Sequence, residues 1–583
     1  MSIFVNTSQW IVKPSPPEEF VALVRKNFSA EGGSAPGGQV SISQFQLLAQ
    51  LLWSRGLKTE AEVDKFLNPD YAKHTHDPFL FKGMDKAVAR LISAIEKKEK
   101  IIVFADYDAD GVDGAAILCE FLKKVGAEYS VFIPDRFKEA YGLSMARIDE
   151  FHGLGAKVIV TIDCGVTDFN EIEKANEYGT DVIVCDHHLV PPRWPNAYAI
   201  IDHKQEDDTY PEKVLSGAGL AFKIVEAVLK RWKHPDIIPG WEKWLLDCVA
   251  IAAIADMVPI TGENRVYVKY GIDVMKKMRR PGLRALLRGR DILPGRITQE
   301  TIGFTIAPRI NAASRMDHAN TAFELLMTEN IAEAEWLSRR LEEKNLERRS
   351  IVEKILITLD ERLKSIPEPR IIFEGSSDWP AGVLGIAANR ILEKYHCPVF
   401  LYAMLPGVIK GSCRGPEGMN IVDFMRTAEG HFTDFGGHAQ AGGFSLLPEK
   451  VLELKSVLEA GIVGIEYDAA APKHEADAAL SMEEVNRDTF NIVQRLQPFG
   501  FGNLEPVFLF QDVEIQDMRH VGSDGTHVKM KLGPQGIGAI YFRASHNGFK
   551  QRDRLDMLAT LQENEWNGNS TIELRVVDAI KRG

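Results

Sequence analysis

Short apolar runs alternate with amphipathic segments in the first half of the chain. From residue 101 onwards, β-branched and aromatic residues form four runs that each reach Asp or His: IIVFADYDADG, KVIVTIDCG, DVIVCDHH and AYAIIDH. Segments with helical spacing, such as AAILCEFLKKVG, lie between them. Apolar strands that alternate with helices form a parallel sheet covered on both faces. The pattern therefore predicts an α/β domain, and ligand sites in such sheets lie at the carboxyl ends of the strands.

The pattern changes further along the chain. The stretch AEAEWLSRRLEEKNLERRSIVEKILITLDERL has helical apolar spacing, dense charge and no Pro or Gly, which is typical of a helix between two domains. A second α/β unit begins at RIIFEG and continues through PVFLYAML. After the linker YDAAAPKHEAD, several short strands separated by turns predict a small barrel of the OB-fold type.

These changes divide the chain into five predicted segments. They are a leader (1–45), a parallel-sheet domain preceded by a helical segment (46–320), a connecting helix (321–366), a smaller α/β domain (367–458) and a β-rich OB-like domain (459–583). Several domains are expected because one domain usually contains about 100–200 residues, and this chain has 583.

Composition adds limits to this picture. No stretch reaches the roughly 20 apolar residues of a membrane span, and the N-terminus has no basic start followed by an apolar run, as a secretory signal would. Six cysteines without CxxC spacing indicate reduced thiols, so we expect a cytoplasmic protein without a membrane partner. The net charge of -13 argues mildly against nucleic acid, but carboxylates that bind cations are neutralised in the working protein.

Acidic residues follow the predicted strands. DYDADG places Asp106, Asp108 and Asp110 at alternate positions, which point in one direction. Asp163 ends the next run in the same way, and Asp256 ends the apolar run VAIAAIADMVP. A solvated acidic turn is the alternative for DYDADG alone, but it does not explain why the other runs also end in acids.

Imidazoles join the acids at the end of a third run. Asp186, His187 and His188 follow the strand DVIVC. Carboxylates and imidazoles gathered at one edge are costly unless cations are bound, and this mixture suits Mn²⁺ or Mg²⁺ better than zinc. A carboxylate that bridges two ions about 3.5–4 Å apart is the two-metal arrangement of phosphodiesterases. The alternative for the histidine pair is a helix cap beside a surface histidine, which we disfavour next to Asp186.

The motifs, taken in order, resemble a known family. DYDADG, IDCG, CDHH and IADMVP resemble the DHH phosphoesterase superfamily. The RecJ-type bacterial exonucleases, which act 5′→3′ on single strands, are similar in further segments: IPDRFKEAYGLS, APRINAASRM, WPAGVLGIAANRI, GSCRG, FGGHAQAGGFS and LQPFGFGNLEPVF. The resemblance covers nearly the whole chain from about residue 45 to 545. Each motif alone is weak, whereas the ordered set is highly specific.

The resemblance implies how two metal ions would be bound. Asp108 and Asp163 would bind one ion, with Asp106 beside them. The second ion would have the ligands Asp110, Asp163, His187 and Asp256. Asp163 would therefore bridge the two ions, and His188 would contact the substrate phosphate or act as an acid–base group. His188 and Asp163 are the expected catalytic residues.

The resemblance also implies a substrate site in the smaller α/β domain, which resembles the DHHA1 domain. In GSCRG, Ser412 can donate to an anion and Arg414 can hold a phosphate through two hydrogen bonds. The GGH turn presents His438. Together with Arg136 and Arg309, these groups would bind the terminal 5′ phosphate or the next phosphates. The alternative for each arginine is an ordinary surface ion pair.

The OB-like domain would add a track for single-stranded DNA through stacking and charge. Its candidates are Tyr541 and Phe542 beside Lys529 and Lys531. Core aromatics and solvated lysines are the alternative, and we prefer a core position for Phe542. The expected substrate is single-stranded DNA with a 5′ phosphate, and a single-strand-binding protein is an expected partner by resemblance only.

Some positions depart from the family pattern. Asp113 stands where the family often has Thr or Ser, and Ser314 replaces a frequent Gly. Pro380 follows Trp379 where a His is common, and GSCRG differs from the usual GSGRS. None of these departures removes a predicted metal ligand.

Three functions remain open from the sequence. The first is a 5′→3′ exonuclease of DNA repair and recombination that releases 5′ mononucleotides from single-stranded DNA. The second is a nanoRNA or cyclic-dinucleotide phosphodiesterase, but such enzymes usually resemble the two α/β domains alone, so the additional segments favour a polymer. The third is a non-catalytic DNA-binding scaffold, and the complete set of Asp and His residues disfavours it.

Overall fold

The computed structural model describes residues 10–30, 42–139, 141–188, 191, 193–366, 369–465, 474–522, 525–544, 547–566 and 569–582. Its internal contacts form two compact units, each assembled from separate stretches of the chain. Unit 1 contains Met1–Thr75, Met257–Lys269 and Pro472–Gly583, and unit 2 contains His76–Asp256 and Tyr270–Ala471. Within the described ranges, we find no helix with the length and apolar character that a membrane crossing requires.

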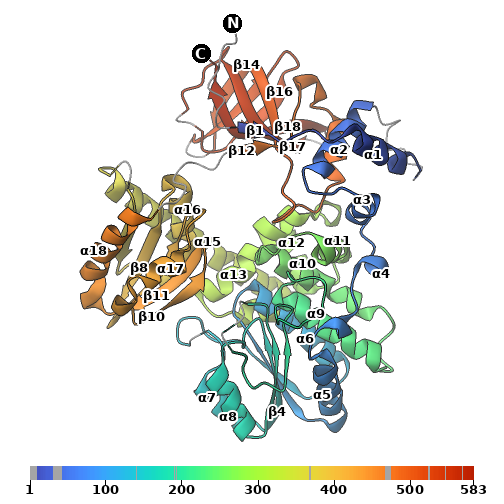
Figure 1. The fold of residues 1–583 in the computed structure, drawn as a ribbon, viewed down its shortest axis with the longest axis vertical. Coiled ribbons are helices and arrows are strands. Elements are labelled where there is room, and N and C mark those ends of the chain that lie inside the picture. The colour runs from blue at the N-terminus through green and yellow to red at the C-terminus, as the bar shows by residue number, and fades with distance from the viewer. Residues whose placement is uncertain are drawn as a thin grey trace. The chain divides into compact units, whose positions relative to one another are not determined.

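Unit 2 contains a parallel sheet of five strands with the order β3-β2-β4-β5-β6. Its central strand, β4, is labelled in Figure 1. The strands are β2 (Lys100–Ala105), β3 (Tyr129–Phe132), β4 (Ala156–Ile162), β5 (Asp181–Cys185) and β6 (Ala199–Ile201). Every neighbouring pair is parallel. All five carboxyl ends therefore meet at one edge of the sheet, and the predicted parallel-sheet domain is confirmed.

Helices cover both faces of this sheet. On one face, α7 (Met145–Gly153) and α8 (Phe169–Glu177) pack against alternate apolar residues of the central strands. On the other face lie α5 (Met84–Lys97), α6 (Ala109–Lys124) and α9 (Gly217–Arg231). Because both faces are buried, the strands are continuous apolar runs, and polar chemistry is restricted to their ends.

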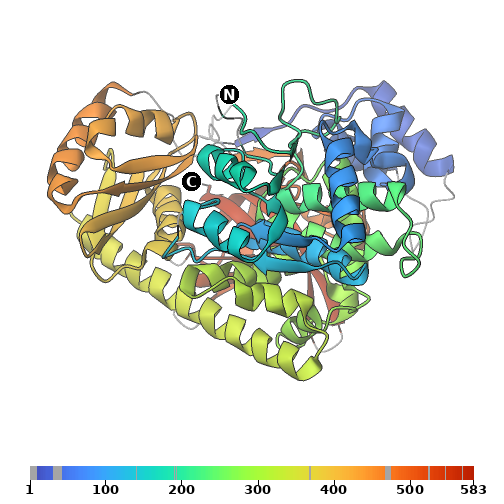
Figure 2. The ribbon, with the colours of Figure 1, turned by 90° about the horizontal axis from the view of Figure 1, so that it is seen from below.

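Helices connect the parallel sheet to the second half of unit 2. They are α10 (Leu246–Ala255), α12 (Pro281–Arg288), α13 (Ala307–Met316), α14 (Asn320–Met327) and α15 (Ile331–Leu363). Figure 2 shows α15 as the long helix that runs towards the second sheet. Its buried positions near the C-terminal end, Val352, Ile355 and Leu359, belong to the apolar core of the second α/β domain.

The second sheet of unit 2 is mixed and has the order β10-β11-β9-β8-β7. Its strands are β7 (Ile372–Ser376), β8 (Val399–Leu405), β9 (Val408–Arg414), β10 (Asp434–His438) and β11 (Ala441–Leu446). Only β7 and β8 pair in parallel. Helix α16 (Leu384–Tyr395) packs with α15 on one face, and α17 (Ile421–Arg426) and α18 (Val451–Gly461) cover the other.

Unit 1 is built on a six-stranded barrel with the order β13-β14-β15-β16-β18-β17. The strands are β13 (Ala478–Ala479), β14 (Phe508–Val521), β15 (His527–Leu532), β16 (Ile537–Tyr541), β17 (Arg554–Trp566) and β18 (Asn569–Lys581). An additional antiparallel pairing of β14 with β17 closes the barrel. The predicted OB-like barrel is confirmed.

The N-terminal part of the chain differs from the prediction. The strand β1 (Trp10–Val12) pairs with β12 (His474–Ala476), and the helix α1 (Glu18–Ala30) buries Phe20 and Val24 in the core beside the barrel. The leader predicted for residues 1–45 is part of a folded unit at these positions, because β1 pairs with a strand more than 400 residues away and α1 packs against α2 and α3. Most of SAEGGSAPGG and of the YDAAAPKHEAD linker lies outside the described residues.

Residues 46–75 also differ from their predicted place. We expected them to precede the parallel-sheet domain as part of it, whereas their contacts assign them to unit 1. The helices α2 (Ile42–Trp53) and α3 (Glu60–Leu67) bury Leu48, Leu52 and Val63 in the same core as the barrel strands. The apolar faces of α2 and α3 thus belong to the core of a barrel that is remote from them in the sequence.

Candidate metal centre

Three acids follow directly after strands of the parallel sheet. The backbone N–H of Asp106 donates to Ile162 O on the neighbouring strand (3.1 Å), and that of Asp163 donates to Cys185 O (2.8 Å). Asp186 continues the pattern with an N–H bond to Ile201 O (3.2 Å). The strand ladder thus extends into the first residue of each loop and fixes the start of each acidic segment at the edge.

The structure brings all six predicted metal ligands together. Three sets of residues each offer ligand atoms within 4.8 Å of one another: Asp163 with His187 and His188, Asp110 with His187 and Asp256, and Asp106 with Asp108 and Asp163. His187 Nε2 lies 3.0 Å from Asp163 Oδ1, 3.5 Å from Asp110 Oδ2 and 3.7 Å from Asp256 Oδ2. Asp163 and His187 each belong to two sets, so the sets form one continuous cluster.

The acids of this cluster lack the partners that buried carboxylates require. Neither Asp106 Oδ1 nor Asp163 Oδ1, both buried, accepts a hydrogen bond from the residues that the structure describes. Burial and neighbouring carboxylates raise the pKa of Asp106 to about 8 and that of Asp163 well above its ordinary value. The same causes raise the pKa of Asp256 to about 8 and that of Asp110 to about 6. Such crowding is costly unless cations compensate it.

The imidazole of His187 has the protonation state that suits a metal ligand. Burial, and then the charge of His188, lower the pKa of His187 to about 3. The ring is therefore neutral at ordinary pH, and a neutral imidazole is the form that coordinates metals. The donor set of carboxylate oxygens with an imidazole nitrogen fits Mn²⁺ or Mg²⁺, and the buried acceptors without partners fit this assignment.

Backbone groups at two helix starts hold Asp108 and Asp110. Asp108 caps α6 by accepting the N–H groups of Asp110 (2.9 Å) and Gly111 (3.3 Å). Asp110 accepts the N–H of Gly217 at Oδ2 (2.6 Å) and that of Ala218 at Oδ1 (2.8 Å), at the start of α9. Carboxylates are favoured at helix N-termini, where N–H groups lack helical partners. Asp108 and Asp110 of DYDADG thus bind backbone N–H groups at helix starts, in addition to being candidate metal ligands.

The backbone at Asp163 has an uncommon conformation. Its φ is 61°, in the left-handed region that a non-glycine residue rarely adopts. Gly217 leaves the space that this requires, because an added Cβ there would lie 2.9 Å from Asp163 Oδ1. Tyr141 Oη donates to the carbonyl of Asp163 (2.8 Å). Strain of this kind is found where the surroundings fix a functional side chain.

His188 is oriented by an acid that the sequence did not mark as functional. His188 Nδ1 lies 2.7 Å from Asp186 Oδ1, and Asp186 also accepts the backbone N–H groups of Val166, His187 and His188. Burial opposes the charged ring, but the hydrogen bond and charge of Asp186 prevail and raise the pKa of His188 to about 9. The adjacency of Asp186 to the two histidines was the available signal for this role.

The second sheet contributes a group close to His188. The rings of His188 and His438 are nearly parallel, at 13°, with centroids 6.0 Å apart. His438 ends β10, directly before the hairpin turn at Ala439 and Gln440, and a Cβ added to Gly437 in this strand would lie 2.3 Å from Ala441 O. The GGH segment is thus the end of a strand and not the turn that the sequence predicts. His438, for which the sequence predicts a contact with a substrate phosphate, thus lies beside His188 at the metal centre.

The GSCRG motif lies on β9, with Ser412 and Arg414 on the sheet face that α16 covers. In the ladder, Ser412 is paired with Leu401 and Arg414 with Val399, and both partners belong to the core beneath α16. Arg414 Nη2 would be only 2.8 Å from a Cβ added to Gly385, in the first turn of α16. A guanidinium beside a helix start offers a combined donor set for an anion.

The two arginines of APRINAASRM have different surroundings. Arg309 is buried; its Nε donates to Glu342 Oε2 (2.5 Å) and its Nη1 to Thr305 O (2.7 Å). The ion-pair alternative applies to Arg309, so this geometry does not support the phosphate contact predicted for it. Arg315 instead donates to Gly382 O (3.1 Å), and its pKa is lowered to about 9 by burial and by the charge of Arg136. Arg315 is a candidate that the sequence pattern did not indicate.

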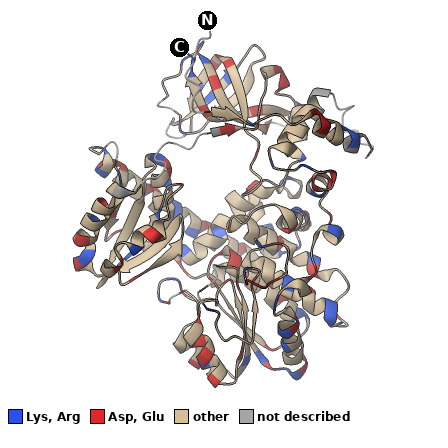
Figure 3. Ribbon diagram, in the orientation of Figure 1, with Lys and Arg blue, Asp and Glu red and all other residues tan. Residues whose placement is uncertain are grey.

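Arg136 and Arg315 belong to a basic group beside the metal centre. The guanidinium of Arg136 lies 4.8 Å from the ring centroid of Tyr107, between Asp106 and Asp108 in sequence. The charges of Arg136 and Arg414 both lower the pKa of Arg315. Across both units, Lys and Arg are interspersed with Asp and Glu (Figure 3), so the net charge of -13 does not prevent a local basic group.

The departures from the family pattern lie at different depths. Asp113 is fully buried on α6, and burial raises the pKa of its carboxyl well above the ordinary value. Ser314 is buried on α13, and its Oγ donates to Asn311 O (3.4 Å). Pro380 precedes the short helix η5 (Ala381–Val383), whose Gly382 carbonyl binds Arg315. Asp113 and Ser314 are therefore interior residues.

The aromatic candidates of unit 1 separate into one core residue and one exposed residue. Tyr541 packs against the barrel core. Phe542 is 49% exposed and lies edge-on to His527, with ring centroids 5.2 Å apart. The core position that we preferred for Phe542 is therefore wrong. Lys529 Nζ is 3.7 Å from Glu573 Oε2, so its charge is partly compensated.

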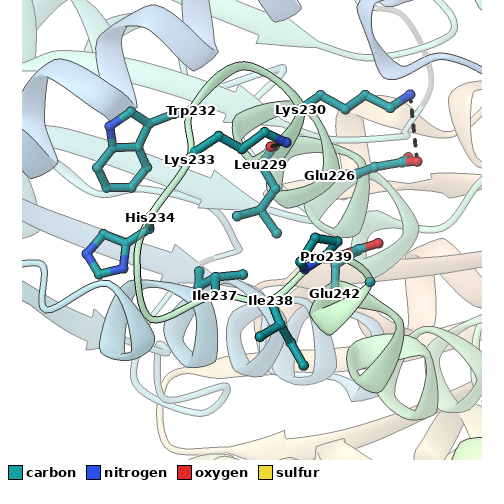
Figure 4. A pocket seen from close by; sticks show the side chains of 11 residues that line it. Glu226, Leu229, Lys230, Trp232, Lys233, His234, Ile237, Ile238, Pro239 and Glu242 are labelled. Atoms are coloured by element: carbon teal, nitrogen blue, oxygen red, sulfur yellow. Dashed lines mark hydrogen bonds and ion pairs between the residues drawn. The ribbon is translucent and has the colours of Figure 1, made fainter.

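A separate hollow of about 180 Å³ lies at the C-terminal end of α9 (Figure 4). It combines apolar side chains such as Ile237 and Ile238 with charged ones, and Lys230 Nζ lies 3.9 Å from Glu226 Oε1. The residues that line it include none of the six predicted metal ligands. Its chemistry gives no reason to associate it with the reaction.

Known protein families match three parts of the chain. The DHH family, N-terminal domain, matches residues 100–253, which contain the parallel sheet. The DHHA1 domain matches residues 368–463, and the RecJ OB domain matches residues 476–578. The three matches fall on the two sheets of unit 2 and on the barrel of unit 1.

Individual relatives match the chain over most of its length. The single-stranded-DNA-specific exonuclease RecJ of Bacillus subtilis is 34% identical over 546 residues, which cover 91% of this chain and 68% of that protein. A crystal structure of RecJ from Thermus thermophilus with Mn²⁺ has a TM-score of 0.82 and 29% identity, over 99% of this chain and 80% of that one. Its counterpart with Mg²⁺ has a TM-score of 0.76 and 28% identity, over 99% and 79% of the two chains.

Proposed function

The chain belongs to the RecJ family of single-stranded-DNA-specific exonucleases, and on this basis we propose that it hydrolyses single-stranded DNA in the 5′→3′ direction and releases 5′ mononucleotides. DNA repair and recombination would be its cellular setting. One observation carries the proposal: six acidic and imidazole groups, distant in sequence, meet at one edge of the parallel sheet with too few partners of their own.

Two divalent ions, Mn²⁺ or Mg²⁺, are the proposed cofactors. One would be held by Asp106, Asp108 and Asp163, and the other by the remaining ligands Asp110, His187 and Asp256 together with Asp163. The position of Asp163 in two of the three ligand sets supports its role as the bridge. When bound, the ions would lower the pKa of the attacking water and stabilise the charge that grows on the phosphate.

His188 is the proposed proton donor. Because its pKa is raised to about 9, the ring carries a proton at neutral pH, and the contact with Asp186 holds it in place. A protonated imidazole that is held firmly can donate to a phosphate oxygen or to the leaving oxygen. The stacked ring of His438 supports a position of the substrate phosphate between the two sheets of unit 2.

The terminal 5′ phosphate is the proposed ligand of the basic group. Arg136, Ser412, Arg414 and His438 would bind it as the sequence suggests, and Arg315 would take the place that we expected for Arg309. The charges of Arg136 and Arg414 lower the pKa of Arg315, so the three side chains are close enough to interact. This proximity supports the proposal that they share one anion. In unit 1, exposed Phe542 beside His527 would contact bases of single-stranded DNA. A single-strand-binding protein is a proposed partner on family resemblance alone.

The decisive experiment follows the direction and the substrate of hydrolysis. With Mn²⁺, a single strand labelled at its 5′ end should lose the label first as a mononucleotide, whereas a 3′-labelled strand should shorten progressively. A blunt duplex should remain intact. Equal digestion of the duplex, release from the 3′ end, or hydrolysis of dinucleotides and cyclic dinucleotides only would refute the proposal, and the last result would favour the second candidate function.

A further inference from the structure

A large aromatic side chain is exposed on an unusual helical turn of unit 2. Phe304 belongs to the π-helix η4 (Thr301–Ile306), and 77% of its surface is exposed. On the same turn, Thr301, Ile302 and Ile306 are buried, so the segment is firmly packed while the ring remains in solvent. An exposed phenyl ring forgoes the stabilisation of burial. π-helical turns are rare and are frequent at functional sites.

This turn is connected to the metal centre on two sides. A Cβ added to Gly303 would lie 3.5 Å from Ile254 Cγ2, on the last turn of the helix that Asp256 follows. The next helix, α13, begins directly after η4, and its Asn311 Oδ1 accepts the N–H of Ala109, within the DYDADG turn (3.0 Å). The backbone of Phe304 is therefore held in a fixed relation to ligands from two different parts of the sequence.

The groups of unit 2 that are proposed to bind the substrate all contact phosphate, and a base contact is so far proposed only for Phe542 of unit 1. An exonuclease that accepts any sequence needs base contacts that do not read hydrogen-bonding edges. Stacking on an aromatic ring meets this need, because every base has a π-face. The packing of the preceding residue, Gly303, against Ile254 near the end of α10 favours a base close to the cleaved bond over an apolar segment of another protein.

We propose that Phe304 is a stacking platform for a base near the 5′ end of the bound single strand. The inference rests on the proposed function and adds a residue that determines how the substrate is held, not how the bond is broken. Its substrate class is any nucleobase of single-stranded DNA. Because stacking contributes to binding and not to proton transfer or metal ligation, its loss should affect KM and the length of each processive run more than kcat.

Two substitutions separate stacking from general apolar contact. Phe304→Leu keeps an apolar side chain but removes the π-face, and Phe304→Trp keeps the π-face. We expect Phe304→Leu to raise KM for a 5′-phosphorylated single strand about tenfold, within the range for loss of one base–aromatic stack, with kcat little changed. Phe304→Trp should restore KM. Ile238→Ala is the matched control, because Ile238 is an exposed apolar residue of the same unit (69%) at the hollow in Figure 4.

A fluorescent base gives a readout that does not depend on turnover. 2-Aminopurine is placed at successive positions from the 5′ end and bound to the Asp163→Asn variant, which we expect not to cleave. Quenching at one position that Phe304→Leu removes and Phe304→Trp retains supports the inference. A substrate with an abasic site at that position should bind equally well to the protein with and without Phe304→Leu.

Several results would overturn the inference. They are an unchanged KM and unchanged quenching in Phe304→Leu, an equal loss on intact and abasic substrates, or an equal effect of Ile238→Ala. Loss of cooperative unfolding in both Phe304 variants would show a structural role and would also refute it. If the wild-type chain digests single strands normally in these cases, the proposed function stands and only the platform fails. A wild-type chain that leaves single strands intact overturns both.

Discussion

The two sheets of unit 2 present their polar groups in different ways. In the parallel sheet, Asp106, Asp163 and Asp186 each follow a strand, and all strands end at the same edge. In the mixed sheet, Ser412 and Arg414 lie on β9, and His438 ends the edge strand β10, which β11 separates from β9. The first arrangement collects like charges, and burial together with neighbouring carboxylates raises the pKa values of Asp106 and Asp163. The second presents donors that carry positive charge or none.

This difference assigns different tasks to the two sheets. Crowded carboxylates gain most from cations, and loss of one bridging ligand should therefore affect the chemical step. Donors on the mixed sheet would contact an anion that is already present in the substrate, so loss of one donor should weaken binding by the value of one charged hydrogen bond. Mutations in the two sheets should consequently differ both in size and in the kinetic constant that changes.

The largest expected effect is that of Asp163→Asn. The substitution keeps the volume of the side chain but removes the negative charge that two ligand sets share. We expect kcat to fall by at least about a thousandfold, as for the loss of several kcal/mol of charge stabilisation. Circular dichroism and thermal unfolding should show an intact fold, because the substitution relieves repulsion among buried acids. The measurement is single-turnover digestion of labelled single strands in Mn²⁺.

Asp202→Asn provides the matched control. Asp202 is also fully buried, follows the last strand of the same sheet, and belongs to none of the three ligand sets. Its substitution should change kcat by no more than severalfold. Comparable losses in the two variants would mean that any buried acid at this edge matters equally, and the special position of Asp163 would have to be abandoned.

The second expected effect belongs to the mixed sheet. Arg414→Ala should raise KM about tenfold for strands with a 5′ phosphate, since a charged hydrogen bond contributes about 1.5–3 kcal/mol, and should change KM much less for strands with a 5′ hydroxyl. The double variant Arg309→Met, Glu342→Gln removes the ion pair of buried Arg309 without leaving a buried charge unpaired, because the second partner of Glu342, Arg290, is exposed. It should keep the preference for 5′ phosphate. Equal losses on both kinds of strand in Arg414→Ala would contradict a phosphate contact.

The same contrast explains how much could be predicted from sequence. The convergence of Asp106, Asp163 and His187 was predictable, because strands that alternate with helices are parallel and parallel strands end together. Asp110 and Asp256 could be added by resemblance. The structure shows that Asp256 follows a helix, α10, and not a strand. Asp256 lies at the edge of the sheet because α10 packs on α6 and α9. A local sequence pattern does not predict this packing.

Side chains that act through tertiary packing were harder to predict. Arg309 and Arg315 are six residues apart on α13, and at about 100° per residue they point to different sides of the helix. The sequence does not tell which side faces Glu342 and which faces the second domain. For the same reason the leader was misjudged, since β1 finds its partner β12 at the other end of the chain.

The smallest expected effect is a dependence of stability on pH in the metal-free protein. The folded chain raises the pKa of Asp106 and Asp256 to about 8, above their values in the unfolded chain. The folded state therefore holds protons that the unfolded state releases, so this contribution to stability is present at low pH and is lost as the pH rises towards 8. His187, whose pKa is lowered to about 3, acts in the opposite direction only below about pH 6.5. Between pH 6.5 and 8.5 the acids and His188 act in the same direction.

In EDTA, the Tm of unit 2 should accordingly fall by a few degrees between pH 6.5 and 8.5, whereas stabilisation by Mn²⁺ should grow over the same range, because metal binding requires deprotonated carboxylates. Differential scanning calorimetry can identify the transition of unit 2 as the one that Mn²⁺ shifts. Asp256→Asn should flatten the dependence in EDTA, since it removes one of the acids with a raised pKa. A metal-free Tm that rises with pH in this range, or an unchanged slope in Asp256→Asn, would mean that the acids of the parallel sheet are not crowded in solution. The contrast with the mixed sheet would then rest on sequence position alone and not on electrostatics.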